Sequence, residues 1–391
     1  MRNNNIPKVR FKQFKGLWNE NKIGNIVSIS AGGDIDRFKL KNKGKYPVIA
    51  NALTNKGIVG FYDDYKVKAP AVTVTGRGDV GYAVARHENF TPIVRLLTLQ
   101  SENIDVDYLE NQINSMRILN ESTGVPQLTA PQLGNYKVYH PEIEEQSAIG
   151  SLFRTLDDLL ASYKDNLANY QFLKATMLSK MLPKAGQTVP EIRLEGFEGE
   201  WENIRLGDCA IIKGRLGWKS LKQEEYTEVG PSMIAGKHIK NGVIDWGEVD
   251  HIPQWRYDES PDIMLEEGDI IFSKDGSLGN PALVSNLKGE ATINSTMMLV
   301  RLDKEVSSQF FYHILTSSVF QKLIYLKVSG SSIPHLFQAD MQDFKFYAPS
   351  IEEQQAIGSY FSNIDNLIAS HQEKISQLET LKKKLLQDMF I

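Results

Sequence analysis

Residues 141–150 have the sequence PEIEEQSAIG and residues 349–358 have the sequence PSIEEQQAIG, so one block recurs at an offset of 208 positions. The match continues without a gap over about sixty residues, from Val125 onward and from Ile333 to the C-terminus. A fainter repeat opens each half, where Phe-x-Gly-x-Trp occupies residues 14–18 and 197–201 at an offset of 183. The chain is therefore a tandem repeat whose frame recurs while the segment between the matched blocks differs in length.

The length of 391 residues exceeds what one hydrophobic core usually organises, and the repeat indicates where the chain divides. Short β-branched and aromatic runs such as residues 46–50 and 57–62 predict strands within each half. We expect an α+β protein with two mixed α/β domains, over 1–140 and 186–348. Each is followed by a helical segment, over 141–185 and 349–391.

Both helical segments carry apolar residues at alternating steps of four and three, which is the seam of a left-handed coiled coil. We expect the two helices to pair with each other, antiparallel, through a seam that includes Ile149, Phe153, Leu156, Leu160, Leu167, Ile357, Phe361, Ile364, Ile368 and Ile375. Lys174 and Lys382 interrupt the seam at the same position. A lysine there either fixes the register of the pair or extends along the seam toward water. The glutamates that precede the seam suit a first helical turn, where they complement the helix dipole.

The composition limits the class of protein. Cys209 is the only cysteine, so no internal disulfide is possible, and no Cys and His cluster has zinc spacing. No apolar run is long enough for a signal peptide or a membrane span, which favours a cytoplasmic protein. Residues 1–140 contain 19 Lys and Arg against 12 Asp and Glu, whereas residues 186–348 contain 16 against 24. A basic first domain is consistent with a nucleic-acid partner.

A glycine-rich turn with one cation follows a buried apolar run in each half, at residues 72–81 and 270–279. Glycines let a backbone approach a ligand closely, and Arg or Lys can reach a phosphate or a guanine edge. The candidate DNA-binding residues of these turns are Thr75, Arg77, Ser273, Lys274 and Ser277. A plain hairpin turn is the competing interpretation.

Three other basic segments are candidates for DNA contact on the same grounds. Their residues are Arg37, Lys39, Lys41 and Lys43 in the first half, and Lys213, Arg215, Lys219, Lys237, His238 and Lys240 in the second. The alternating cations of residues 37–45 would lie on one side of a strand. A solvated basic face with no ligand is the alternative. No motif for catalysis, metal binding or cofactor binding occurs, so the chain suits a recognition protein better than an enzyme.

The doubled PxIEEQxxIG block, the two heptad helices and the Phe-x-Gly-x-Trp openings together resemble the specificity subunit of Type I restriction-modification systems. The resemblance covers nearly the whole chain. It implies two target recognition domains that each read one half of a bipartite double-stranded DNA target, with the helix pair setting the gap.

The same resemblance implies two modification subunits that bind S-adenosylmethionine and methylate adenine. In the full complex it implies two restriction subunits that use ATP and Mg²⁺, and no cofactor on this chain. Two alternatives differ in class: a coiled-coil scaffold that does not read DNA, and a DNA-modifying enzyme whose motif is unrecognised.

Overall fold

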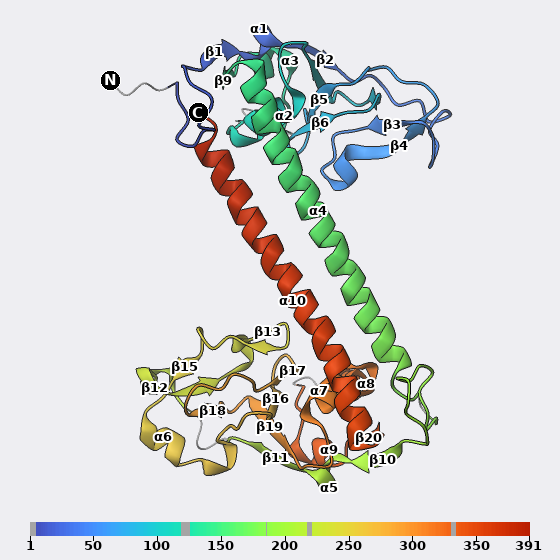
Figure 1. Ribbon diagram of the computed structural model, residues 1–391, viewed down its shortest axis with the longest axis vertical. Coiled ribbons are helices and arrows are strands. Elements are labelled where there is room, and N and C mark those ends of the chain that lie inside the picture. The colour runs from blue at the N-terminus through green and yellow to red at the C-terminus, as the bar shows by residue number, and fades with distance from the viewer. Residues whose placement is uncertain (1–4, 119–125, 185, 217–220, 330–333) are drawn as a thin grey trace. The chain divides into compact units, whose positions relative to one another are not determined.

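The computed structural model describes residues 5–118, 126–184, 186–216, 221–329 and 334–391 (Figure 1). They form two compact units, one of Met1–Asn166 with His371–Ile391 and one of Leu167–Ser370. Each unit combines a β-rich domain with parts of two long helices, α4 (Ile143–Lys180) and α10 (Ile351–Asp388). The predicted α+β fold is confirmed, and both long helices lie inside the segments predicted for them.

The first unit is built on a four-stranded antiparallel sheet in the order β2-β8-β5-β6 and a three-stranded sheet in the order β4-β3-β7. Its strands are β1 (Asn19–Lys22), β2 (Ser28–Ala31), β3 (Tyr46–Ile49), β4 (Ile58–Tyr62), β5 (Ala71–Val74), β6 (Ala83–Arg86), β7 (Thr91–Pro92), β8 (Leu97–Gln100) and β9 (Lys137–His140). The predicted strands at 46–50 and 57–62 are confirmed as β3 and β4. The helices α1 (Ile23–Ile26), α2 (Val106–Ser115) and α3 (Ala130–Gly134) complete the domain.

The second unit repeats this topology, although its strands have different sequences. The sheet β11-β19-β16-β17 corresponds to β2-β8-β5-β6, the sheet β15-β12-β18 to β4-β3-β7, and the pair β10-β20 to β1-β9. The strands are β10 (Glu202–Arg205), β11 (Ala210–Gly214), β12 (Thr227–Ile234), β13 (Ile239–Lys240), β14 (Val243–Ile244), β15 (Asp250–His251), β16 (Ile270–Ser273), β17 (Gly279–Leu283), β18 (Ala291–Ile293), β19 (Met297–Leu302) and β20 (Lys345–Ala348). The helices are α5 (Leu206–Cys209), α6 (Gln254–Asp258), α7 (Ser308–Thr316), α8 (Ser318–Ser329) and α9 (Gln338–Gln342).

The segment between the repeated blocks is longer in the second unit, and part of the difference lies between β12 and β16. The small hairpin β13-β14 and the helix α6 lie between β12 and β16. Between the corresponding strands β3 and β5, the first unit has β4 and a short 3-10 turn instead. This connection is therefore longer in the second unit, as is the segment from α7 to β20 that contains α8, while the order of the shared sheets is unchanged.

The repeated Glu-Glu-Gln block joins each domain to its helix. The Gln146 side chain accepts a hydrogen bond from the Asp105 amide (3.0 Å) and donates one to the Pro141 carbonyl (2.9 Å). Gln354 makes the same two bonds, with the Ser307 amide (3.0 Å) and the Pro349 carbonyl (2.9 Å). Because Asp105 and Ser307 are the N-caps of α2 and α7, each glutamine fixes the start of a domain helix against the start of a long helix.

The two tryptophans of the repeated Phe-x-Gly-x-Trp openings lie in equivalent cores. Trp18 and Trp201 are buried, and their rings meet Tyr108 and Phe310 edge to face at 6.1 and 5.9 Å. This packing contributes to the cores that hold the N-terminal segment of each repeat on its domain.

The helices pair antiparallel within each unit, as the heptad pattern predicts. All ten predicted seam residues are buried or half-buried. In the first unit Lys382 Nζ lies 2.5 Å from Asp157 Oδ1, and in the second Lys174 Nζ lies 2.5 Å from Asp365 Oδ1. Both members of one pair are displaced by 208 positions from the members of the other. Each seam lysine thus reaches an aspartate of the opposite helix, which favours a role in register over simple extension toward water.

Candidate nucleic-acid interface

The glycine-rich turn of the first unit joins β5 to β6 and exposes Arg77. The Thr75 hydroxyl accepts a hydrogen bond from the Tyr82 amide at 3.0 Å and donates one to the Asp79 carbonyl, which closes the turn. Gly78 has a φ of +74°, a conformation that glycine adopts without steric cost. Thr75 is buried and its hydroxyl is occupied by backbone groups, whereas Arg77 and Asp79 are exposed.

The corresponding turn of the second unit joins β16 to β17. Ser273 is buried, and its hydroxyl lies 3.5 Å from Met297 Sδ. Ser277 is exposed and Lys274 is half-buried. Gly276 repeats the positive φ of the first turn, at +72°. Ser273, like Thr75, therefore supports the turn from inside, while Lys274 and Ser277 remain accessible.

The two turns share their backbone but place their cations differently. The Gly76 carbonyl accepts from the Leu128 amide at 3.0 Å, and the Lys274 carbonyl accepts from the Leu336 amide at 2.9 Å. Lys274 is therefore the structural counterpart of Gly76, and Arg77 is the counterpart of Asp275. The sequence echo found the correct turns, but the two cations occupy adjacent positions.

The basic segment at residues 37–45 is not the strand that alternation predicted. Residues 37–39 form a turn, because the Asp36 carboxylate accepts the amides of Phe38 (3.0 Å) and Lys39 (3.4 Å). Only Lys41 joins a sheet, through one antiparallel bridge to Phe61. The side chains of the predicted contacts Arg37, Lys39, Lys41 and Lys43 are all exposed. They lie on a loop, so their cations are not aligned along one side of a strand.

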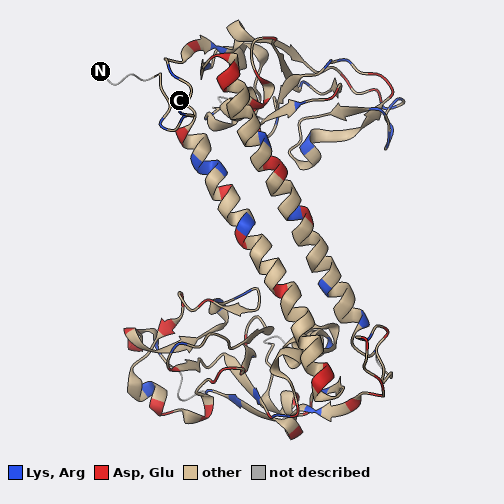
Figure 2. Cartoon of the chain, viewed as in Figure 1, with Lys and Arg blue, Asp and Glu red and all other residues tan. Residues whose placement is uncertain are grey.

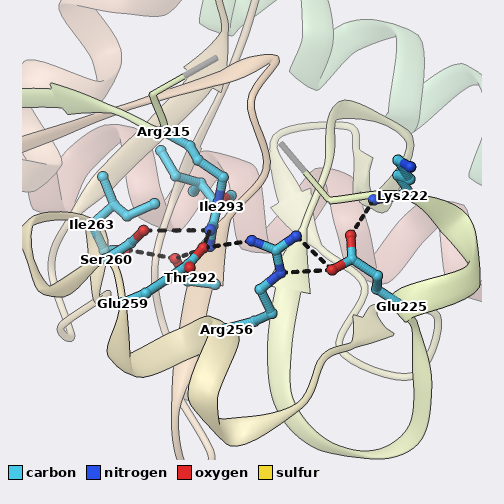
Figure 3. A network of polar contacts seen from close by, with 9 residues as sticks. All are labelled: Arg215, Lys222, Glu225, Arg256, Glu259, Ser260, Ile263, Thr292 and Ile293. Carbon is cyan, nitrogen blue, oxygen red and sulfur yellow. Dashed lines mark hydrogen bonds and ion pairs between the residues drawn. The ribbon is translucent and has the colours of Figure 1, made fainter. Parts of the chain in front are cut away.

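Arg215 is a buried structural residue, which corrects its assignment as an accessible DNA contact (Figure 3). Its guanidinium donates to the Ile293 carbonyl (3.1 Å), the Ser260 hydroxyl (3.4 Å) and the Thr292 hydroxyl (3.4 Å). Glu259 lies 3.8 Å from the same guanidinium. Burial lowers the pKa of Arg215, and Glu259 acts in the opposite direction. This side chain holds the end of β11 to the domain.

A second arginine extends this network toward the surface. Arg256 contacts Glu225 at 2.5 Å and Glu259 at 2.9 Å, while Glu225 also accepts the Lys222 amide at 2.8 Å (Figure 3). The neighbouring Trp255 is 60% exposed, and the Arg256 guanidinium lies 4.7 Å from its ring centre. The network orders the segment around Lys222 and presents one large aromatic ring to solvent.

Of the remaining predicted DNA contacts in the second unit, the histidine is buried and the described lysines are accessible. His238 is buried with its Nδ1 accepting from the Ala235 amide at 3.0 Å, and burial is the main cause that lowers its pKa. His238 is thus corrected from an accessible contact to an internal one. Lys237 and Lys240 are exposed and pair with Asp250 (2.9 Å) and Asp245 (2.7 Å). Lys213 is also accessible and lies 3.8 Å from Asp262, whereas Lys219 lies outside the described residues.

Two exposed aromatic residues and one pair of polar positions were not predicted from the sequence. Phe38 is fully exposed between Arg37 and Lys39, and Trp255 is exposed beside Arg256. In the sequence, the signal that could have identified both residues is an aromatic residue next to a cation. Gln127 and His335 face the glycine-rich turns across backbone bridges, and their equivalence follows from the offset of 208.

Acidic and basic residues are interspersed over both units (Figure 2). Among the described ranges no group of three or more His, Cys, Asp or Glu residues could hold a metal ion. None of the helices in the described part of the chain has both the length and the apolar character of a membrane span.

Comparison with known proteins places both repeats in one family. A family model described as the Type I restriction modification DNA specificity domain matches residues 15–169 and residues 198–380. The specificity subunit of the Type I restriction enzyme MjaVIII from Methanocaldococcus jannaschii is 22% identical over 274 residues, which cover 68% of this chain and 64% of that subunit. The matched part thus spans less than two thirds of that relative. A putative type I specificity subunit from Mycoplasma pneumoniae is 22% identical over 375 residues, which cover 94% of both chains.

A solved structure supports the same fold. The S subunit of a Type-I restriction-modification system from M. genitalium superposes with a TM-score of 0.72, over 99% of both chains, at 18% sequence identity. At this identity the similarity establishes the shared fold, in which the two repeated domains and the two long helices are all matched.

Proposed function

Because the chain belongs to the Type I restriction modification DNA specificity family, we propose that it is the DNA-reading subunit of a Type I restriction-modification complex. Each β-rich domain would read one half of a bipartite target. The observation that carries this proposal is the repeated scaffold: two domains share their sheet topology and their glycine-rich turns, yet carry different side chains on those turns. Two such domains suit two different half-sites on one duplex.

The paired helices would set the gap between the half-sites. An α-helix of 38 residues, the length of both α4 and α10, extends about 57 Å. The seam contacts Lys382 to Asp157 and Lys174 to Asp365 pin the register of the pair. A pair that cannot slide would keep the gap constant.

Catalysis would belong to partner subunits. We infer two modification subunits that bind S-adenosylmethionine and methylate adenine, and two restriction subunits that use ATP and Mg²⁺. This chain would contribute recognition and no catalytic group. The acidic balance of residues 186–348 fits this division, because partners can supply cations for the shared DNA.

The test is adenine methylation mapped at base resolution in a host that expresses this chain with a Type I modification subunit. The control host expresses the modification subunit alone. We expect one split motif, with two short defined halves around a fixed gap, only when this chain is present. A confirmed complex that adds no methylation would reject the proposal and favour a scaffold that does not read DNA.

A further inference from the structure

One backbone bridge in each unit presents a facing pair of polar side chains, and the two pairs differ. We propose that Arg77 with Gln127, and Asp275 with His335, are the base-reading pairs that give the two domains different half-sites. This inference rests on the proposed DNA-reading function and names the residues that would set its specificity.

The two bridges are equivalent by their hydrogen bonds. Arg77 pairs with Gln127, and Asp275 pairs with His335, each as a single antiparallel bridge beside a glycine-rich turn. Within the turns the Val80 amide donates to the Gly78 carbonyl at 2.9 Å, and the Leu278 amide donates to the Gly276 carbonyl at 3.0 Å. Position 77 therefore corresponds to 275, and position 127 to 335.

The frame around each bridge is conserved between the units, whereas the facing pair is not. Leu128 and Leu336, which follow the second member of each pair, are both buried, at 5% and 0% exposure. In an antiparallel bridge the two facing side chains lie on the same side of the backbone. Each bridge thus combines a buried leucine anchor with two polar side chains that share one face.

The described surroundings leave these side chains accessible. Arg77 and Gln127 are exposed, and Asp275 and His335 are each about one third exposed, at 35% and 29% of the side chain. The His335 ring lies 4.3 Å from the ring of Phe337, and its Nδ1 contacts Asp275 Oδ1. The imidazole is held in place from two sides, while its Nε2 is not used in that contact.

The two pairs differ most at their charged members, Arg77 and Asp275. Arginine donates two hydrogen bonds to guanine O6 and N7, and glutamine combines a donor and an acceptor that match adenine N7 and N6. A carboxylate only accepts, and it takes the exocyclic amine of cytosine. When His335 Nδ1 donates to Asp275, Nε2 of the neutral ring also accepts. The first pair is therefore suited to a guanine beside an adenine, and the second to an exocyclic amine.

The experiment uses the full chain in complex with a modification subunit, and methylation maps report each half-site separately. We expect Arg77→Ala and Gln127→Ala to relax one half-site, and His335→Ala to relax the other half-site. Discrimination at the affected base pair should fall roughly 5- to 150-fold. Lys68→Ala and Lys304→Ala, at exposed lysines away from both bridges, should leave both halves unchanged.

A conservative variant and a transfer variant separate base reading from a role in folding. Arg77→Lys keeps the charge and loses the two-pronged donor, so the complex should still methylate its site but accept other bases at one position. The double variant Arg77→Asp with Gln127→His should replace the guanine read there by cytosine, whose exocyclic amine a carboxylate accepts.

Three outcomes would overturn the inference while the proposed function stands. The motif could be unchanged in Gln127→Ala and His335→Ala, or both variants could alter the same half-site. Methylation could also fall equally at all sequences. The last would make these residues phosphate contacts. Absence of any split motif with the unmodified chain would instead reject the proposed function, and the inference with it.

Discussion

Arg10 shows how one repeated residue joins the N-terminal segment to a long helix. Its guanidinium donates two hydrogen bonds of 2.7 Å to the Glu145 carboxylate, whose side chain is 3% exposed. The bond to Glu145 is the main cause that raises the pKa of Arg10. Removal of the arginine would leave a carboxylate buried without its cation, which is more costly than the loss of the contact itself.

We therefore expect Arg10→Ala to lower the free energy of unfolding by about 3 kcal/mol. Urea denaturation followed by circular dichroism would measure the change. The matched variant is Arg193→Ala, because Arg193 makes the same two bonds to Glu353 at 2.9 and 2.6 Å. The double change Arg10→Met with Glu145→Met should recover most of the loss. A loss below about 0.5 kcal/mol would show that the pair behaves like an exposed one.

Single residues were the least predictable level from sequence. Arg215 lies in a basic segment, which suggested a DNA contact. Its partners Ser260 and Thr292 lie 45 and 77 positions away, so its burial depends on the tertiary fold. His238 is internal for the same reason. The glycine-rich turns were located correctly because glycine at a positive φ leaves a local signal. Which side chains touch DNA stays a prediction.

The seam lysines connect single contacts to the pairing of whole helices. Lys382 and Asp157 are 25% and 42% exposed, so their 2.5 Å contact is partly screened by water. We expect Asp157→Lys to destabilise the pairing, because it sets two cations against each other at the seam. The charge swap Asp157→Lys with Lys382→Asp should restore it. A double-mutant cycle by thermal unfolding should give a coupling of about 0.5 to 1 kcal/mol.

The repeat supplies the control for this cycle. The same set of variants at Lys174 and Asp365 should give a coupling of similar size, because that contact has the same 2.5 Å separation. If the double swap is no more stable than Asp157→Lys alone, the two charges do not interact and the lysine only extends along the seam.

Elements with a strong period were predictable, and elements without one were not. The four-three spacing located both long helices and every seam residue, since helical period is a local property. Alternating cations at 37–45 suggested a strand, but the Asp36 side chain binds the following amides and forms a turn. The equivalence of the three-stranded sheets in the two units could not be seen in sequence, because β4-β3-β7 and β15-β12-β18 share topology and lie outside the repeated blocks.

At the scale of the whole molecule, two buried groups give the units opposite responses to pH. His313 in the second unit is buried, and burial, reinforced by Lys174, lowers its pKa to about 3; Asp365 lies 4.0 Å from the ring. Protonation is thus easier in the unfolded chain, so this unit loses stability as pH falls below about 6.5.

Glu110 in the first unit has the reverse behaviour. Burial, reinforced by Asp157 and Asp107 and opposed by Lys382, raises its pKa to about 7. The protonated form is favoured in the folded unit, so its stability contribution is complete at low pH and is lost as pH rises from about 4.5 through 7.

We expect each group to change the free energy of unfolding by about 2 kcal/mol between pH 5 and 7, in opposite directions. In the unmodified chain these two contributions largely cancel, so they should change the unfolding temperature little across this pH range. Glu110→Gln should make stability rise with pH, and His313→Asn should make it fall. Asn111 occupies the equivalent position to His313 in α2, so asparagine is compatible with the site. Identical pH profiles for both variants would contradict these assignments.

The length of the helix pair is the last property that the proposed function makes testable. The contacts Lys382 to Asp157 and Lys174 to Asp365 define the antiparallel register, which places Tyr170 opposite Ile368 and Ala369. One heptad inserted after Tyr170, with a second inserted after Ile368, would keep the seam in phase. Each helix would then lengthen by about 10 Å, which is roughly three base pairs of duplex.

We expect the lengthened chain to direct methylation to a motif with unchanged halves and a gap about three base pairs longer. Occupancy should fall, because three base pairs also turn the second half-site by roughly 100° around the duplex, while a heptad leaves the seam facing the same way. An insertion in α4 alone should abolish the motif, since the contacts of Lys382 with Asp157 and of Lys174 with Asp365 can then no longer form together. A change in either half-site, with the gap constant, would show that the helices influence base reading and do not measure distance.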